Sequence, residues 1–310
     1  MDKELVIVRA SWVGIVGNAL LSILKIVIGI ISGSMAVVGD GIDSATDIIT
    51  SLITLFTAKM MRKKPNIRYA YGYYKADTVA SKALAFVIFF AGFQLALTTC
   101  QRLINNEVSQ IPSFIAIVVT LISIVGKFFL ARFQMFSGRK VKSAMLIANG
   151  KNMQNDILIS SGVLLGLIFT YWLKMPILDF ITALAISIYI MYSAITIFLE
   201  VNRDLMDGID DTSLYYEVVK SSVEVKGVYN PHRIRIRRLG DKILIALDIE
   251  VKGSISVKES HEIAHRVEKN IKNKIEDVYD IIIHIEPYGL HHEKEVFGVA
   301  PCHLNVSQKD

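Results

Sequence analysis

Residues 39–47 read Gly39-Asp40-Gly41-Ile42-Asp43-Ser44-Ala45-Thr46-Asp47, which places three carboxylates inside an apolar run long enough to cross a bilayer. A charge at the centre of a membrane costs at least ~2.5 kcal/mol on insertion scales, so buried acids there indicate a functional site. Asp43 and Asp47 share one helix face because they are four residues apart, and Asp40 precedes Asp43 by one turn. We therefore predict that this face binds a cation or protons.

The composition of the chain indicates a membrane protein with a second, more polar part. Of its 310 residues 52% are hydrophobic, and the mean hydropathy is +0.44, which is too apolar for one soluble domain. The net charge of +5 comes from basic residues at the ends of the apolar spans, a distribution that sets membrane orientation rather than nucleic-acid binding. The two cysteines, Cys100 and Cys302, predict neither a disulfide framework nor a thiolate metal site.

Apolar segments long enough to span a bilayer occupy residues 8–31, 36–60, 78–101, 112–135, 143–172 and 177–200. The links that follow the second and fourth segments are rich in Lys and Arg, whereas the other links hold few basic residues. By the positive-inside rule the basic links, and with them both termini, are cytoplasmic. We expect an integral protein of the inner cell membrane, in contact with membrane lipid.

The chain beyond Glu200 has the pattern of a small soluble domain. Helical periodicity over 210–225 and 257–275, and strand patterns over 233–237, 243–251 and 280–285, give the order α-β-β-α-β. This order predicts an open sheet with two helices on one face. The predicted fold is an α-helical membrane domain with six transmembrane helices over 1–208, a small cytoplasmic α+β domain over 209–289, and a loose tail over 290–310.

A second group of polar residues lies in the fifth span, where Asn152 and Asp156 are again four residues apart. Facing Asp43 and Asp47, this pair would complete a set of four oxygen ligands. Metal binding requires deprotonated carboxylates and so releases protons, and clustered carboxylates in a low dielectric take up protons when the metal leaves. One site could thus exchange a divalent metal for protons. For Asp40 the sequence leaves three roles open, namely an accessory ligand, a pathway residue or a carboxylate nearer the water.

Several features together resemble the cation diffusion facilitator family. They are the six spans, the Asp43-x-x-x-Asp47 and Asn152-x-x-x-Asp156 pairs, the α-β-β-α-β domain, and the run Tyr71-Gly72-Tyr73-Tyr74-Lys75-Ala76-Asp77 before the third span. The resemblance covers residues 8–288. It implies a homodimeric exporter, not an enzyme, that moves divalent metal out of the cytoplasm as protons enter. The metal would lie between the second and fifth spans, and no organic cofactor is implied.

The resemblance also implies roles for residues outside the transport site. It puts regulatory metal in the soluble domain at His232, His261, His284 and Glu286. The family's further histidine on the middle strand appears as Ala246 or nearby, and an exposed histidine can equally be ordinary polar surface. Lys75 and Asp207 match positions that form an ion pair in the family, although two unrelated solvated charges would look the same in the sequence.

The choice of metal depends on Asn152. Many zinc-transporting relatives carry a histidine at this position, so the amide makes the present site all oxygen. Oxygen ligands favour Mn²⁺ over Zn²⁺, with Fe²⁺ between them, although affinity order alone favours Zn²⁺ at almost any site. We expect Mn²⁺, with Zn²⁺ or Fe²⁺ as the alternatives.

Two other classes of protein compete with a transporter. An intramembrane aspartyl protease needs one acid on each of two helices, sharing a proton and a water, whereas this chain puts three acids on one helix with an amide opposite. A membrane metal sensor or scaffold that does not transport would carry the same ligands. Metal uptake driven by a pH gradient distinguishes the transporter from both.

Overall fold

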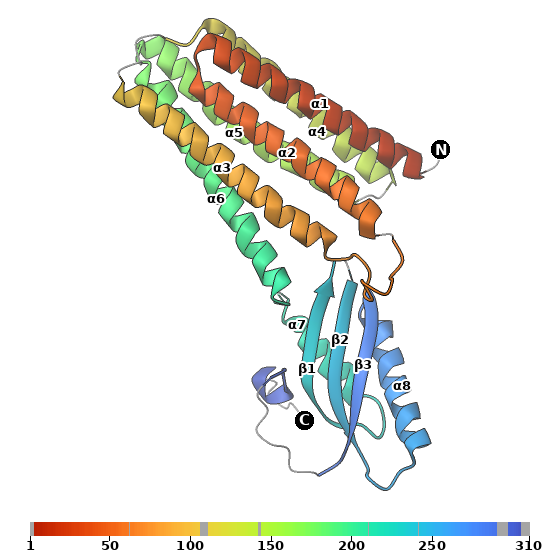
Figure 1. Cartoon of the computed structure of the whole chain (residues 1–310). Helices are drawn as coiled ribbons and strands as arrows, with labels where there is room; N and C mark the ends of the chain where they lie inside the picture. Colours follow the sequence, from red (N-terminus) through yellow and green to blue (C-terminus); the bar gives the residue numbers. More distant parts are fainter. Residues whose placement is uncertain are drawn as a thin grey trace. The chain divides into compact units, whose positions relative to one another are not determined.

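The computed structural model describes residues 3–61, 63–105, 111–141, 144–209, 211–240, 242–289 and 297–304, which form two compact units (Figure 1). The first unit comprises residues 1–59 and 80–199, and the second comprises residues 60–79 and 200–310. Each unit has its own hydrophobic core. The second unit is therefore built from two separate stretches of the chain.

Long helices run side by side through the first unit (Figure 1). Their bounds are α1 Lys3–Ser32, α2 Met35–Met61, α3 Ala76–Ile104, α4 Phe114–Val141, α5 Ala144–Leu173 and α6 Ile177–Leu205. These helices confirm the predicted segments and extend most of them by a few residues. Among the described residues, five helices have the length and hydropathy of a membrane span. The remaining one, α2, does not meet this measure, and its sequence includes Asp40, Asp43, Asp47 and several hydroxyl side chains.

The helical unit has an apolar interior and also presents apolar side chains outward. Helix α4 packs against α1 and α5, and a buried apolar cluster joins α2, α3, α5 and α6. Gly41 lets α1 approach α2 closely, since a Cβ added there would lie 3.0 Å from the backbone nitrogen of Ile26. Exposed aromatic side chains such as Phe90 and Phe129 suit contact with lipid tails.

The second unit contains a three-stranded sheet of order β1-β2-β3, with bounds β1 Tyr229–Leu239, β2 Lys242–Val251 and β3 Val278–Pro287. Strand β2 is antiparallel to β1 and parallel to β3. The parallel connection runs through α8 (Val257–Lys274), as a parallel crossover requires. Helix α7 (Ser213–Val223) contacts α8, and both lie behind the sheet in Figure 1. The predicted α-β-β-α-β order is confirmed.

Alternation along β2 separates a core face from a polar face. Ile245, Leu247 and Ile249 are fully buried and join residues of α7 and α8 in one hydrophobic cluster. The residues between them point to the opposite face, where Asp248 and Glu250 are also buried, at 4% and 5% exposure. Two buried acids on the polar face require partners.

Residues 297–304, within the segment 290–310 for which we expect a loose tail, are described and contact the sheet domain. Val299 forms an isolated antiparallel bridge with Ile234 of β1, through two backbone hydrogen bonds of 2.9 Å. A short 3₁₀ helix, η1, follows at Pro301–Leu304, and Leu304 packs against the core of the sheet domain. His291 and His292 lie outside the described residues.

Candidate metal sites

A polar cavity of about 430 Å³ lies inside the helical unit. Its charged lining residues are Asp43 and Asp47 from α2 and Asp156 from α5. Asn152 lines the same cavity and donates a hydrogen bond from Nδ2 to Asp47 Oδ1 at 3.3 Å. The i, i+4 spacing on each helix therefore brings the four predicted transport ligands to one space, across more than 100 residues of sequence.

Further neutral polar groups line the cavity, and the sequence alone does not show that they belong to one site. They come from α1, α4, α5 and α6 and comprise Asn18, Gln134, Asn149, Asn155, Tyr189 and Ser193. Gln134 donates to the backbone carbonyl of Ala10 at 2.9 Å, which ties α4 to α1. These groups make the cavity suitable for a hydrated cation, because amide and hydroxyl oxygens can replace or hold its water.

Asp156 is also half of a buried ion pair. Lys127 Nζ, on α4, lies 2.9 Å from Asp156 Oδ2, and the lysine side chain is fully buried. Sequence analysis did not predict this pair. Lys127 was nevertheless a signal for a buried partner, because a lysine in the apolar stretch Ile124-Val125-Gly126-Lys127 is as costly in a membrane as an acid.

Asp40 has a different environment from Asp43 and Asp47. Its Oδ2 lies 2.8 Å from Lys25 Nζ of α1, and its Oδ1 accepts a hydrogen bond from Ser160 Oγ at 2.8 Å. Lys25 also donates to Ser160 and Ser44 at 3.0 and 3.4 Å. Asp40 is 1% exposed and is not among the residues that line the cavity. The structure thus favours a structural role for Asp40 over that of an accessory ligand.

Another buried acid of the helical unit, Asp179 of α6, contacts the start of α2. It accepts hydrogen bonds from Ser34 Oγ at 2.5 Å and from the backbone nitrogen of Met35 at 2.8 Å. A carboxylate at this position satisfies unpaired N–H groups and interacts favourably with the helix dipole. Asp179 therefore anchors α2 to α6, away from the cavity.

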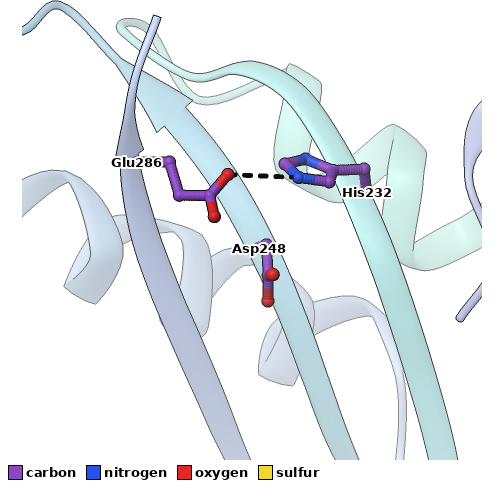
Figure 2. Close-up of side chains that lie close together, drawn as sticks. All are labelled: His232, Asp248 and Glu286. Carbon is purple, nitrogen blue, oxygen red and sulfur yellow. Dashed lines mark ion pairs between the residues drawn. The ribbon is translucent and has the colours of Figure 1, made fainter. Parts of the chain in front are cut away.

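The sheet domain holds a second cluster of candidate ligands. Figure 2 shows His232 on β1, Asp248 on β2 and Glu286 on β3, three adjacent strands. Their ligand atoms lie within 4.8 Å of one another, and no other group of three or more His, Cys, Asp and Glu side chains in the described residues does so. His232 Nε2 is 3.2 Å from Glu286 Oε2. One imidazole and two carboxylates form a donor set that suits Zn²⁺, Mn²⁺ or Fe²⁺.

Strand register explains why these residues meet. His232 pairs with Asp248 between β1 and β2, and Glu250 pairs with Glu286 between β2 and β3. The His232 ring is oriented because its Nδ1 lies 2.8 Å from the carbonyl oxygen of Asn230, which turns Nε2 toward Glu286. In metal-binding histidines the ring nitrogen that does not bind the metal typically makes a hydrogen bond of this kind.

The structure brings together two of the four predicted residues of this site, His232 and Glu286, and adds Asp248. Asp248 lies on the middle strand two residues beyond Ala246, which pairs with Arg235, further along β1 than His232. His284 lies beside the cluster, with Nε2 3.5 Å from Glu286 Oε1, and its side chain is 65% exposed. His261 is exposed on α8 and stacks on His265, with ring centroids 6.4 Å apart, so it is not in the cluster.

Arginines of β1 link this cluster to the tail. Arg233 Nη1 lies 3.4 Å from Asp248 Oδ2, and both Arg233 and Arg235 stack on the ring of Phe297, with centroid distances of 5.5 and 5.3 Å. Gly298 is needed next to this ring because a Cβ there would lie 2.7 Å from the Cα of Arg233. The ordered part of the tail thus covers the arginines that balance the acidic cluster.

The ion pair implied for Lys75 and Asp207 is present in the second unit. Lys75 Nζ lies 2.8 Å from Asp207 Oδ1, and Arg237 donates to Asp207 Oδ2 at 2.6 and 2.9 Å. Burial raises the pKa of Asp207, but hydrogen bonds and positive charges from Lys75 and Arg237 outweigh it and hold the pKa below its usual value. Asp207 therefore joins the segment before α3, the end of α6 and β1.

A depressed pKa at Asp207 predicts how stability depends on pH. The carboxylate stabilises the folded unit fully above the ordinary Asp pKa of about 3.9 and loses this effect as pH falls through its lower folded value. Asp207→Asn should therefore lower the thermal unfolding midpoint between pH 5 and 8, and the difference from wild type should begin to shrink below about pH 4 and disappear only below the depressed pKa of Asp207. Asp277→Asn is the matched control, because both residues have positive φ and an ion-pair partner but the Lys242–Asp277 pair is more exposed. An equal effect of the two variants would contradict the prediction.

Comparison with known proteins agrees with this architecture. The family model for the cation efflux transmembrane domain matches residues 11–206, and that for the cation efflux protein cytoplasmic domain matches residues 211–288. An uncharacterised transporter of Methanocaldococcus jannaschii is 32% identical over 275 residues, which are 88% of this chain and 95% of the relative. The manganese efflux system protein MneS of Bacillus subtilis is 28% identical over 279 residues, 89% of this chain and 94% of the relative.

Two further relatives span most or part of the chain. The magnetosome protein MamB of Magnetospira sp. is 30% identical over 270 residues, 85% of this chain and 89% of the relative. The solved metal-bound C-terminal domain of the CzcD transporter from Thermotoga maritima is 37% identical, covers 27% of this chain and all of its own, and has a TM-score of 0.26. The two family models together cover most of the sequence, from residue 11 to residue 288. The chain is an integral membrane protein that belongs to the cation diffusion facilitator family of metal efflux transporters.

Proposed function

We propose that this transporter exports a divalent metal ion from the cytoplasm in exchange for protons, with Asp43, Asp47, Asn152 and Asp156 as the transport site. The observation that carries the proposal is the single polar cavity into which α2 and α5 bring these four side chains. The comparisons give no support to a protease, because the model that matches residues 11–206 is that of the cation efflux transmembrane domain. Asn152 would have to rotate its amide to present oxygen to the metal, since its Nδ2 now faces Asp47.

The proton half of the exchange follows from the charges that line the cavity. A divalent ion neutralises carboxylates that otherwise repel one another in a low dielectric, and protons do the same when the ion leaves. Asp43, Asp47 and Asp156 are the titrating ligands in this scheme, whereas Asn152 contributes oxygen without titrating. The direction, efflux, is that of the family whose model matches residues 11–206, and the positive-inside rule puts the termini on the cytoplasmic side of the inner membrane.

Transport by the purified protein in lipid vesicles tests this function. With a pH gradient across the membrane, addition of Mn²⁺ should produce metal movement coupled to proton movement in the opposite direction, followed with a pH-sensitive dye and a metal-sensitive dye. A protein that binds Mn²⁺ but moves neither metal nor protons would support a sensor or scaffold instead. Cleavage of a membrane peptide without metal movement would support a protease.

Mn²⁺ is the proposed substrate, ahead of Zn²⁺ and Fe²⁺. Four oxygen ligands favour the harder ion, and a relative over most of the chain is named as a manganese efflux protein. Replacing Asn152 with histidine should shift competition in favour of Zn²⁺ over Mn²⁺ by about tenfold, because imidazole suits Zn²⁺ better than Mn²⁺. Competition of Mn²⁺, Fe²⁺, Zn²⁺, Co²⁺ and Ni²⁺ for both proteins measures the shift. An unchanged order would show that selectivity arises elsewhere.

The second candidate function is metal-dependent regulation at the sheet domain. His232, Asp248 and Glu286 fit a metal because an oriented imidazole and two carboxylates converge within ligand distance, and His284 lies at the edge of the same group. We infer that the transporter is a homodimer through this domain, and His261, exposed on α8, would meet metal from a second subunit. Metal that binds one conformation more tightly would then bias the transport cycle.

A further inference from the structure

We propose that Lys127 sets the net charge of the transport cavity so that the cavity matches one divalent ion. This inference rests on the proposed transport site, since it concerns Asp156 as a ligand. Lys127 would act as a specificity-determining residue that positions Asp156 and cancels one charge without itself touching the metal. It lies on α4, which supplies no residue of the ligand set.

The position of Lys127 supports a fixed electrostatic role. Its side chain is fully buried, and Nζ lies 2.9 Å from Asp156 Oδ2. Burying an ammonium group in the membrane is costly unless an opposite charge compensates it. Asp156 nevertheless lines the cavity, so the same carboxylate contacts the lysine and also faces the cavity in which the ion would bind. The ammonium is therefore close enough to act on a bound cation while remaining outside the cavity lining.

A second buried ion pair lies close to the cavity, and its two charges oppose each other. Lys25 and Asp40 are both buried to within 1% of full burial and compensate each other at 2.8 Å, with Ser160 bonded to both. Neither residue lines the cavity. This pair contributes no net charge, and it serves as an internal control for Lys127 because it is equally buried between α1 and α2.

The other charges near the cavity sum to a net charge that is equal in size and opposite in sign to that of a divalent cation. When ionised, the carboxylates of Asp43, Asp47 and Asp156 carry three negative charges, and Lys127 cancels one of them. A divalent cation then leaves the cavity neutral, whereas a trivalent cation leaves an excess positive charge and a monovalent one leaves a deficit. Excess charge in a low dielectric is strongly unfavourable, so Lys127 selects ions by charge while Asn152 and the cavity geometry select among divalent ions.

Charge-altering variants test this role with Mn²⁺ and Tb³⁺ as probes. The measured quantity is the ratio of the Kd for Mn²⁺ to the Kd for Tb³⁺, by Tb³⁺ luminescence and Mn²⁺ competition on the full chain. Only binding that is lost in Asp47→Asn is assigned to the cavity. Lys127→Gln, which leaves three negative charges, should raise the ratio by about tenfold or more. Lys127→Arg should stay within about threefold of wild type, because it keeps the charge.

Matched variants separate the charge from the shape of the lysine. The double variant Lys127→Gln/Asp156→Asn removes the pair and keeps the net charge, so its ratio should resemble wild type although both affinities fall. Asp156→Asn alone leaves one negative charge and should lower the ratio by about tenfold. Removing the other pair, in Lys25→Met/Asp40→Leu, should leave the ratio unchanged.

Two results would overturn the inference, and they differ from a failure of the transport site. If wild type shows no Asp47-dependent Mn²⁺ binding, the proposed transport site is wrong. If wild type binds Mn²⁺ in the cavity but Lys127→Gln leaves the ratio within about threefold of wild type, Lys127 does not set the charge. Should Lys127→Gln fail to fold, the comparison of Asp156→Asn with the double variant decides. A ratio that is about tenfold lower in Asp156→Asn than in the double variant supports the role of Lys127. Equal ratios in these two variants refute it.

Discussion

Replacing Asp47 with asparagine is expected to abolish metal-coupled proton movement in vesicles while the helical unit stays folded. Asp47 lines the cavity and accepts a hydrogen bond from Asn152, and an asparagine oxygen can still accept that bond. The variant therefore removes one negative charge and an anionic ligand with little change in shape. Changes outside the ligand shell already cost about 10–100-fold in metal affinity, so loss of a ligand should weaken cavity binding by about 100-fold or more.

Asp40 provides the contrasting variant on the same helix. Asp40→Asn leaves the ammonium of Lys25 buried without its carboxylate, and breaking a buried pair in this way costs roughly 3–5 kcal/mol. We expect a lower thermal unfolding midpoint but an unchanged Mn²⁺ affinity for the protein that remains folded. Loss of affinity in Asp40→Asn with normal stability would return Asp40 to the ligand set. Retained transport in Asp47→Asn would exclude the proposed site.

Asp156 should show both effects at once. It lines the cavity and also compensates Lys127, so Asp156→Ala is expected to lose transport and to unfold at a lower temperature than Asp47→Asn. Adding Lys127→Met should restore part of the stability, because replacing both members of a buried pair is tolerated better than replacing one. It should not restore transport, since the ligand is still missing.

Asp248→Asn is expected to abolish metal binding at the sheet domain. The change removes one of the two carboxylates that converge with His232 in the cluster, and the affinity should fall by about 100-fold or more for the same reason as at the cavity. Calorimetric titration of the full chain in an Asp47→Asn background isolates this site. Transport should persist in Asp248→Asn alone but should lose any dependence on cytoplasmic metal that wild type shows.

Glu250→Gln is the matched control for Asp248. Glu250 is equally buried, two residues along the same face of β2, and accepts hydrogen bonds from Asn230 at 2.6 Å and from the backbone nitrogen of Gly289 at 3.3 Å. Its carboxylate is not part of the cluster, so the variant tests loss of a nearby charge without loss of a ligand. Metal binding that is retained in Asp248→Asn but lost in Glu250→Gln would place the site elsewhere on the sheet.

Much of the fold follows from local patterns in the sequence. Apolar runs between basic links define the long helices, and a change from helical to alternating periodicity marks the sheet domain. Spacing by four residues also puts Asp43 with Asp47, and Asn152 with Asp156, on common helix faces. These features depend on near neighbours in the chain, and that is why periodicity reveals them.

The position of Asp248 in the cluster could have been expected from a local pattern. Two acids at alternating positions in an otherwise apolar strand, Asp248 and Glu250, already indicate a polar face that needs partners. The resemblance to the family pointed instead to a histidine position that is occupied here by Ala246 or a nearby residue. The positions of His232 and Arg233 could not be read in this way, because register shifts on either side of His232 in β1 break simple alternation.

The sequence by itself determined the order of the helices and strands along the chain and the acids on α2 and α5. Only the tertiary structure decided which of the three carboxylates in residues 39–47 line the cavity. Asp40 is instead paired with Lys25 of α1, and Asp156, which lines the cavity, is also paired with Lys127 of α4. The physical reason is that a buried charge takes its role from the nearest opposite charge, and that partner is set by helix packing rather than by spacing along the chain.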